Sequence, residues 1–148
     1  MGNNGQPTGI KSQNQSQQKN SQMISRGKNM KFILIKTNLD FQIVNIDRYN
    51  FLQKCYELIG CCCIEVCVPR PLSGCLRYVV DDCGKLNDQH FNLLASVFYD
   101  RDDPIFGNVI LGVCGVNEYG EQDICGLTDE QCKLLCNILS SIKASLIY

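Results

Sequence analysis

The composition of the chain changes sharply near residue 30, and this break limits where a fold can form. Residues 1–29 contain fifteen Asn, Gln or Ser residues and no aromatic residue. Such a segment cannot bury enough apolar surface to offset the entropy lost when it is ordered. We therefore expect a disordered tail over residues 1–29 and a single folded domain over residues 30–148, a length suited to one domain.

Charge divides at the same point and bears on the class of partner. Four of the fourteen Lys and Arg residues lie in the tail, which leaves ten basic residues against fifteen acidic ones in the domain. A nucleic-acid-binding protein concentrates Lys and Arg to neutralise phosphates, so an acidic domain argues against a nucleic-acid partner. No apolar run approaches the roughly 18–20 residues that span a bilayer. The N-terminus lacks the hydrophobic stretch of a signal peptide. We expect a cytoplasmic protein that does not bind membranes.

Eleven cysteines lie between Cys55 and Cys136, mostly within hydrophobic runs such as residues 61–68. A reduced cysteine behaves as a small apolar residue, and disulfides are rare in the cytosol. Structural zinc sites usually contain Cys-x2-Cys pairs, and the sequence has none. Cys63 with Cys67, and Cys132 with Cys136, are the closest approximations. We expect most cysteines to be reduced, metal-free core residues.

Hydrophobic periodicity predicts the order ββαββαβα. This order indicates an α+β fold: a single small domain with a mixed, mostly antiparallel sheet and about three helices packed on it. The expected strands cover residues 32–35, 41–46, a segment ending at Val68, 76–80 and 109–113. Helices are expected between Asp47 and Gly60, over residues 89–99 and from Thr128 onward, the first of them carrying Phe51, Leu52, Cys55, Leu58 and Ile59 at helical spacing.

Local signals support the helix limits. Asp47 is a suitable N-cap for the first helix and Gly60 a suitable end. Thr128 and Gln131 form a capping-box pattern before the last helix. A glycine-containing loop is expected between residues 113 and 128. The apolar face of the last helix should consist of Leu134, Leu135, Ile138, Leu139 and Ile142.

No constellation of catalytic residues is visible, and no cofactor is predicted. A cysteine nucleophile needs a base, and the sequence places no particular cysteine beside His90, the single histidine. The acidic clusters at residues 81–82 and 100–103 lie in expected turns, where Asp is favoured for local hydrogen bonding. The glycines of residues 112–115 are too weak a signal for a phosphate loop.

Several short motifs occur in a fixed order along the chain: Leu52-Gln53, Ile59-Gly60, Ile64-Glu65, Val80 to Leu86, Asn92, Ala95-Ser96, Ile105 to Ile110 and Leu127-Thr128. Together they resemble a small domain of unknown function, family 3846, which occurs widely in phages and mobile elements and in some protists. The resemblance covers about residues 31–139 and implies no established activity. One departure is that relatives have two glycines after the first helix, whereas here Gly60 is followed by three cysteines.

Four polar residues in these motifs are candidate ligand-binding residues: Glu65, Asp82, Lys85 and Asn92. Glu65 lies within an otherwise apolar expected strand, and Asn92 lies near the apolar face of an expected helix. A buried charge or amide needs partners. Glu65 and Asn92 therefore either satisfy each other or the backbone, or they bind a ligand.

These observations favour a small non-enzymatic intracellular binding module for an unknown protein or small-molecule ligand. Interference with a host factor by a mobile-element product, or sequestration of a small signalling molecule, are specific forms of this hypothesis. The alternative is a hydrolase or transferase that uses the polar segment 81–92, with Asp82, Lys85 or His90 as reactive groups.

Overall fold

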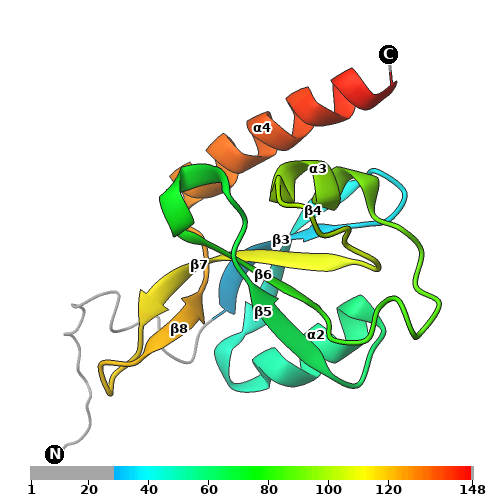
Figure 1. Ribbon diagram of the computed structural model, residues 1–148. Helices are drawn as coiled ribbons and strands as arrows, with labels where there is room; N and C mark the ends of the chain where they lie inside the picture. The colour runs from blue at the N-terminus through cyan, green and yellow to red at the C-terminus, as the bar shows by residue number, and fades with distance from the viewer. Residues whose placement is uncertain (1–28, 148) are drawn as a thin grey trace, which may run out of the picture.

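The computed structural model describes residues 29–147 (Figure 1). The expected tail therefore lies outside the described residues, except Asn29, which begins the first strand. The elements are β3 (Asn29–Ile35), β4 (Phe41–Asp47), η2 (Arg48–Asn50), α2 (Phe51–Ile59), β5 (Ile64–Cys67), η3 (Pro71–Gly74), β6 (Leu76–Asp81), α3 (Leu93–Tyr99), β7 (Val109–Val116), β8 (Gln122–Cys125) and α4 (Asp129–Ile147).

The six strands form one sheet in the order β4-β3-β7-β6-β5, with β8 beside β7. Every strand pair is antiparallel, so the α+β prediction with about three helices is confirmed. The strand over residues 109–116 is central, because it pairs with β3, β6 and β8. β4 and β5 form the two ends of the order.

One strand, β8, was expected to be loop. Its residues are polar or half-buried and carry no apolar run, so periodicity gives no strand signal. The hairpin forms because Asn117 organises its turn: the Oδ1 atom accepts hydrogen bonds from the Tyr119 and Glu121 amides at 2.9 and 3.0 Å. Pairing with β7 then supplies backbone partners along one side of β8.

Successive side chains along each strand point to opposite faces of the sheet, so the sheet contributes to two cores, one on each face. Ile33 and Ile35 of β3 pack in a core with α3 and α4, whereas Phe32 and Leu34 pack in a second core with α2. Figure 1 shows α3 and α4 on one side of the sheet and α2 on the other. The fold is therefore a three-layer arrangement of helix, sheet and helix.

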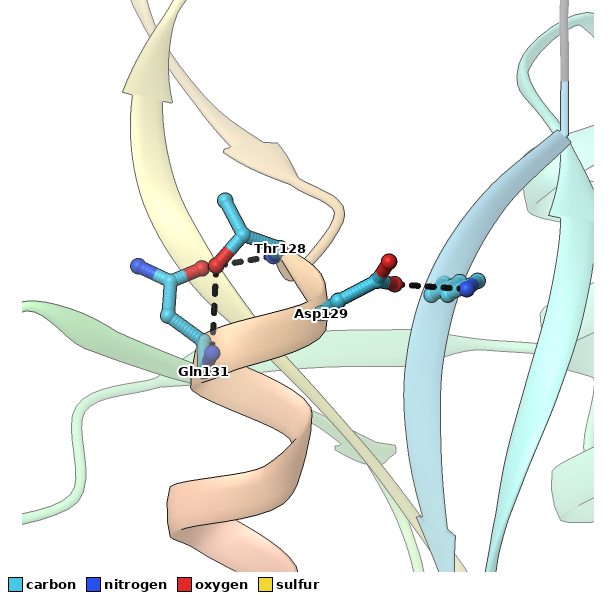
Figure 2. A network of polar contacts seen from close by, with 4 residues as sticks. Thr128, Asp129 and Gln131 are labelled. Atoms are coloured by element: carbon cyan, nitrogen blue, oxygen red, sulfur yellow. Dashed lines mark hydrogen bonds and ion pairs between the residues drawn. The ribbon is translucent and has the colours of Figure 1, made fainter.

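The end of α2 and the start of α4 follow the local sequence signals, whereas α2 begins only at Phe51, later than the expected N-cap Asp47 predicts. Gly60 has a φ of 80° and its amide donates to the Tyr56 carbonyl at 2.8 Å, which ends α2. Asp47 caps the short turn η2 that precedes α2, by accepting from the Tyr49 amide. Figure 2 shows the capping box of α4, in which the Thr128 amide donates to Gln131 and the Gln131 amide donates to Thr128.

The helix expected over residues 89–99 begins only at Leu93, so the prediction of its start is wrong. Tertiary contacts hold the four preceding residues in other conformations. Gln89 donates to Asp81 at 3.0 Å, and Phe91 forms an isolated bridge with Phe106. Asn92 then acts as the N-cap, with its side chain accepting from the Ala95 amide.

The cysteines are less buried than expected. All eleven are free, but only Cys55 and Cys132 are fully buried, while Cys62, Cys63 and Cys75 are exposed. The core interpretation is wrong for these three. Residues 61–63 precede the edge strand β5 instead of continuing a central strand, so one side of this segment lacks a neighbour among the described residues.

None of the helices in residues 29–147 combines the length and the apolar character that a membrane span requires.

The helices also expose part of their expected apolar faces. Leu135 and Leu139 of α4 are buried, but Leu134 is 49% exposed, contrary to expectation. Helical spacing places Leu134 beside residues that face solvent, since one helix face contacts the sheet and α3.

Candidate functional site

A cavity of about 350 Å³ lies at the edge of the sheet beside β5. It brings together three of the four candidate residues, Glu65, Asp82 and Lys85, from separate parts of the chain. The other contributors come from the strands β5 and β6, the end of α3 and two loops. They are Cys67, Val80, Asp81, Cys83, Gly84, Leu86, Tyr99, Asp103, Pro104, Ile105 and Phe106.

Strand register determines which β5 side chains face the cavity. Glu65 pairs with Val80, and Cys67 pairs with Tyr78. Directly opposed residues of antiparallel strands project to the same face. Val80 and Tyr78 belong to the core beneath α3 and α4, so Glu65 and Cys67 lie on that face. Because β5 ends the sheet, Glu65 is exposed at the rim instead of buried as the sequence suggested.

The loop that follows β6 is held by Asp81, which is only 6% exposed. Its carboxylate accepts hydrogen bonds from the Cys83 amide at 2.9 Å, from Gln89 at 3.0 Å and from Asn87 at 3.2 and 3.3 Å. Gln89 Nε2 also lies 3.3 Å from the Gly60 carbonyl oxygen and so links this loop to the end of α2. Asp81 therefore fixes the backbone on which Asp82 and Lys85 are carried.

The hydrogen bonds also set the protonation of Asp81. Burial alone raises its pKa, but the hydrogen bonds from Gln89, the Cys83 amide and Asn87 together outweigh burial. The pKa of Asp81 consequently lies below its ordinary value. Sequence reasoning assigned this residue only to a turn and missed its burial, which depends on the distant residue Gln89.

The cavity has an acidic and partly aromatic wall. Glu65, Asp82 and Asp103 are exposed carboxylates, and Lys85 is the one basic residue among the lining residues. Lys85 Nζ lies 3.4 Å from Asp103 Oδ1 and 6.0 Å from the centroid of the Phe106 ring. Sequence reasoning placed Asp103 in an acidic turn but gave no reason to associate it with Glu65.

Two neutral polar groups complete the wall. Burial is the main cause that raises the pKa of the Cys67 thiol above its ordinary value. Burial likewise raises the pKa of Tyr99 to about 12. Both groups are therefore protonated at neutral pH, so Cys67 is a weak nucleophile in this state.

The fourth candidate, Asn92, does not line this cavity. It is fully buried, and its Nδ2 donates to the Ile35 carbonyl at 3.1 Å and to the Gly107 carbonyl at 2.8 Å. Its Oδ1 accepts from the Ala95 amide at 3.0 Å. All these partners are backbone groups. Asn92 is therefore satisfied by the backbone and not by Glu65, which lies apart from it in the structure.

Other sequence features have packing explanations. A Cβ on Gly112 would lie 2.8 Å from the Cys125 carbonyl oxygen and 2.9 Å from the Phe32 ring, so this glycine permits close packing of β7. His90 is exposed and is not among the cavity residues. Within the part of the chain that the structure describes, no group of three or more His, Cys, Asp or Glu residues is arranged to hold a metal ion.

Comparison with known proteins identifies a family but no characterised relative. No curated protein matches the chain, and no solved structure matches it. The model of one family, described as domain of unknown function (DUF3846), matches residues 30–140. This match includes every residue that lines the cavity and covers most of the sequence. The chain is a member of this family of domains of unknown function.

Proposed function

We propose that this protein is a non-enzymatic binding module that holds a positively charged group of a small-molecule ligand in the cavity beside β5. One observation carries the proposal: Glu65, Asp82 and Asp103 line the same cavity. Carboxylates in a partly enclosed site attract cations more strongly than isolated surface carboxylates, because the surrounding protein reduces screening by water.

Lys85 supports this choice of ligand class. Its ammonium group lies close to both Asp103 and the Phe106 ring. Carboxylate contacts and an aromatic face are the features that proteins use to bind ammonium and guanidinium groups. The Lys85 side chain is 59% exposed, so a ligand cation can displace it without disturbing the core.

The lining groups favour binding over catalysis. The lowered pKa of Asp81 makes it a poor proton acceptor at neutral pH, and its oxygens already accept hydrogen bonds. Cys67 and Tyr99 both have raised pKa values. The alternative is a hydrolase or transferase based on the segment 81–92. Of its three proposed reactive groups, Asp82 and Lys85 line the cavity but His90 does not.

Sequestration of a small signalling molecule in the cytoplasm is the biological form of binding that we favour. The supporting feature is a concave site sized for part of a small molecule. Interference with a host protein is the second form. A mobile-element origin belongs to the same hypothesis and is based on the sequence resemblance alone.

Native mass spectrometry of the full chain, purified from its own host, tests the proposal directly. We expect a retained compound that contains an ammonium or guanidinium group. A co-purifying protein would favour interference with a host factor. A retained anionic compound would contradict the proposed ligand class, and turnover of the retained compound would establish the enzymatic alternative.

Calorimetry with spermidine as a model polycation gives an independent measurement. We expect the combined substitutions Glu65→Gln and Asp103→Asn to weaken binding by about tenfold or more, a change of roughly 1.4 kcal/mol. Asp102→Asn is the matched control, because Asp102 is exposed and adjacent in sequence but is not among the lining residues. Equal weakening by Asp102→Asn would show that spermidine binds the acidic surface in general.

A further inference from the structure

Within the part of the chain that the structure describes, the outer edge of β4 has no neighbouring strand, and it lies at the end of the sheet opposite the cavity. Lys36 donates its amide to the Asp40 carbonyl at 2.8 Å, which identifies the even-numbered residues of β4 as those bonded to β3. The Leu127 amide donates to Lys31 on the other side of β3, in agreement with this assignment. The amide and carbonyl groups of Phe41, Ile43 and Asn45 and the amide of Asp47 therefore point outward from the sheet, whereas the Asp47 carbonyl begins η2.

The two edges of the sheet differ in how they are protected. Natural edge strands avoid unwanted pairing by being short, by carrying charge, or by having another group cover their backbone. β5 has two of these features, four residues and the charged Glu65, and directly after it the Arg101 side chain donates to the Val68 carbonyl at 2.7 Å. β4 is seven residues long, has its one charge at its last residue, and exposes 47% of Ile43.

We propose that β4 pairs with β4 of a second copy of this chain to form a twofold-symmetric dimer with one continuous sheet. An antiparallel register centred on Val44 places Phe41 opposite Asp47, and Ile43 opposite Asn45, of the second copy. Outward-facing residues then meet outward-facing residues, which allows about six backbone hydrogen bonds, because the Asp47 carbonyl of each copy is already used in η2. A twofold axis uses the same surface on both copies, as most homodimers do.

Side chains beside the edge are complementary in this register. A hollow of about 380 Å³ lies between the start of β4 and the last turns of α4, and it is lined by Phe41, Lys143 and Ile147 among others. Phe41 and Asp47 project to the same sheet face, since they are an even number of positions apart. Asp47 of the second copy thus lies on the face that carries Lys143, whose ammonium group already pairs with Asp40 at 3.0 Å.

The proposed interface leaves the cavity beside β5 open, because β4 and β5 are at opposite ends of the sheet. One strand pair with its flanking side chains lies at the small end of specific interfaces, so a dimer that dissociates at micromolar concentrations is expected. Dimerisation is therefore independent of the proposed ligand.

Sedimentation velocity of the full chain, with reductant to prevent cross-linking through exposed cysteines, tests the proposal. We expect a monomer–dimer equilibrium whose mean mass rises to that of two chains with concentration. Ile43→Lys should raise the dimer Kd by about tenfold or more, whereas Val66→Lys should not. Val66 is a matched control because it lies on the other edge strand and is 51% exposed. A wild-type chain that stays monomeric to millimolar concentration overturns the proposal, as does equal weakening by both substitutions.

Two further variants distinguish loss of pairing from loss of folding. If Ile43→Lys lowers the melting temperature, Asn45→Lys takes its place as the test of dimerisation, because Asn45 is exposed. Adding Asn45→Glu to Ile43→Lys sets opposite charges across the interface in the proposed register, and we expect it to restore part of the dimer. If the double variant dissociates as readily as Ile43→Lys, the pairing centred on Val44 is wrong.

Discussion

The side-chain amide of Asn92 donates a 3.1 Å hydrogen bond to the carbonyl oxygen of Ile35, which lies 57 residues earlier in the chain. The same amide bonds to Gly107, and the Asn92 oxygen caps α3. One buried side chain therefore joins the end of β3, the segment before β7 and the first turn of α3. These hydrogen bonds explain why a polar residue is buried in the core, without the need for a bound ligand.

Asn92→Ala should destabilise the protein strongly. The substitution removes the cap of α3 and leaves two buried carbonyl groups without their partner, so we expect a loss of about 2–4 kcal/mol in the free energy of unfolding. Urea denaturation measures it. Asn38→Ala is the control, because Asn38 makes one hydrogen bond in an exposed turn. Similar losses for both variants would contradict the structural role of Asn92.

Asp81 should make the free energy of unfolding depend on pH in the acidic range. Its folded-state pKa is lowered, so its carboxylate stabilises the fold above the ordinary Asp pKa of roughly 3.9. That contribution is lost as the pH falls through the folded-state pKa. Asp81→Asn should therefore lower stability at pH 7 by about 1.5–3 kcal/mol and reduce the loss between neutral and acidic pH. Urea denaturation at several pH values measures this, with the exposed residue Asp82→Asn as control. An unchanged acid dependence in Asp81→Asn would show that other groups cause it.

The cysteines should react in an order set by their exposure. Alkylation followed by mass spectrometry at pH 8 should modify Cys62, Cys63 and Cys75 first and Cys55 and Cys132 last. Burial raises the pKa of Cys55 to about 12, which further slows its reaction because the thiolate is the reactive form. All eleven should react after unfolding without reductant. Fewer than eleven would reveal disulfides or another modification.

Residues 1–29 should contribute little to folding, a prediction based on their composition. A chain that begins at Met30 should melt within about two degrees of the full chain, since a change of 1 kcal/mol shifts the melting temperature of such a domain by roughly 4 °C. Differential scanning calorimetry of both chains measures it. A shift of several degrees would show that the tail contacts the domain and would refute the proposed boundary.

Local signals identified most elements of the fold, because the information needed lies within a few neighbouring residues. The capping box of Thr128 and Gln131 forms as expected, and Gly60 ends α2 as expected. The start of α3 was not predictable in this way. Gln89 turns toward Asp81 and Phe91 toward Phe106, and neither partner lies within one helical turn.

The candidate site shows the same division. Asp82 and Lys85 were recognisable as a polar turn because they are three residues apart. Asp103 was not associated with them, since its ion pair with Lys85 spans 18 residues. Glu65 was expected inside a strand, and only the position of β5 at the sheet edge determines that it is exposed.

The sequence by itself determined the α+β class with a mostly antiparallel sheet and most helix limits, since periodicity and caps act over one or two turns, and it showed the resemblance to a domain family. The tertiary structure alone decided which strands lie at the edges, which cysteines are exposed, and which carboxylates share a cavity. These properties depend on contacts between residues tens of positions apart, whose pairing no local pattern encodes.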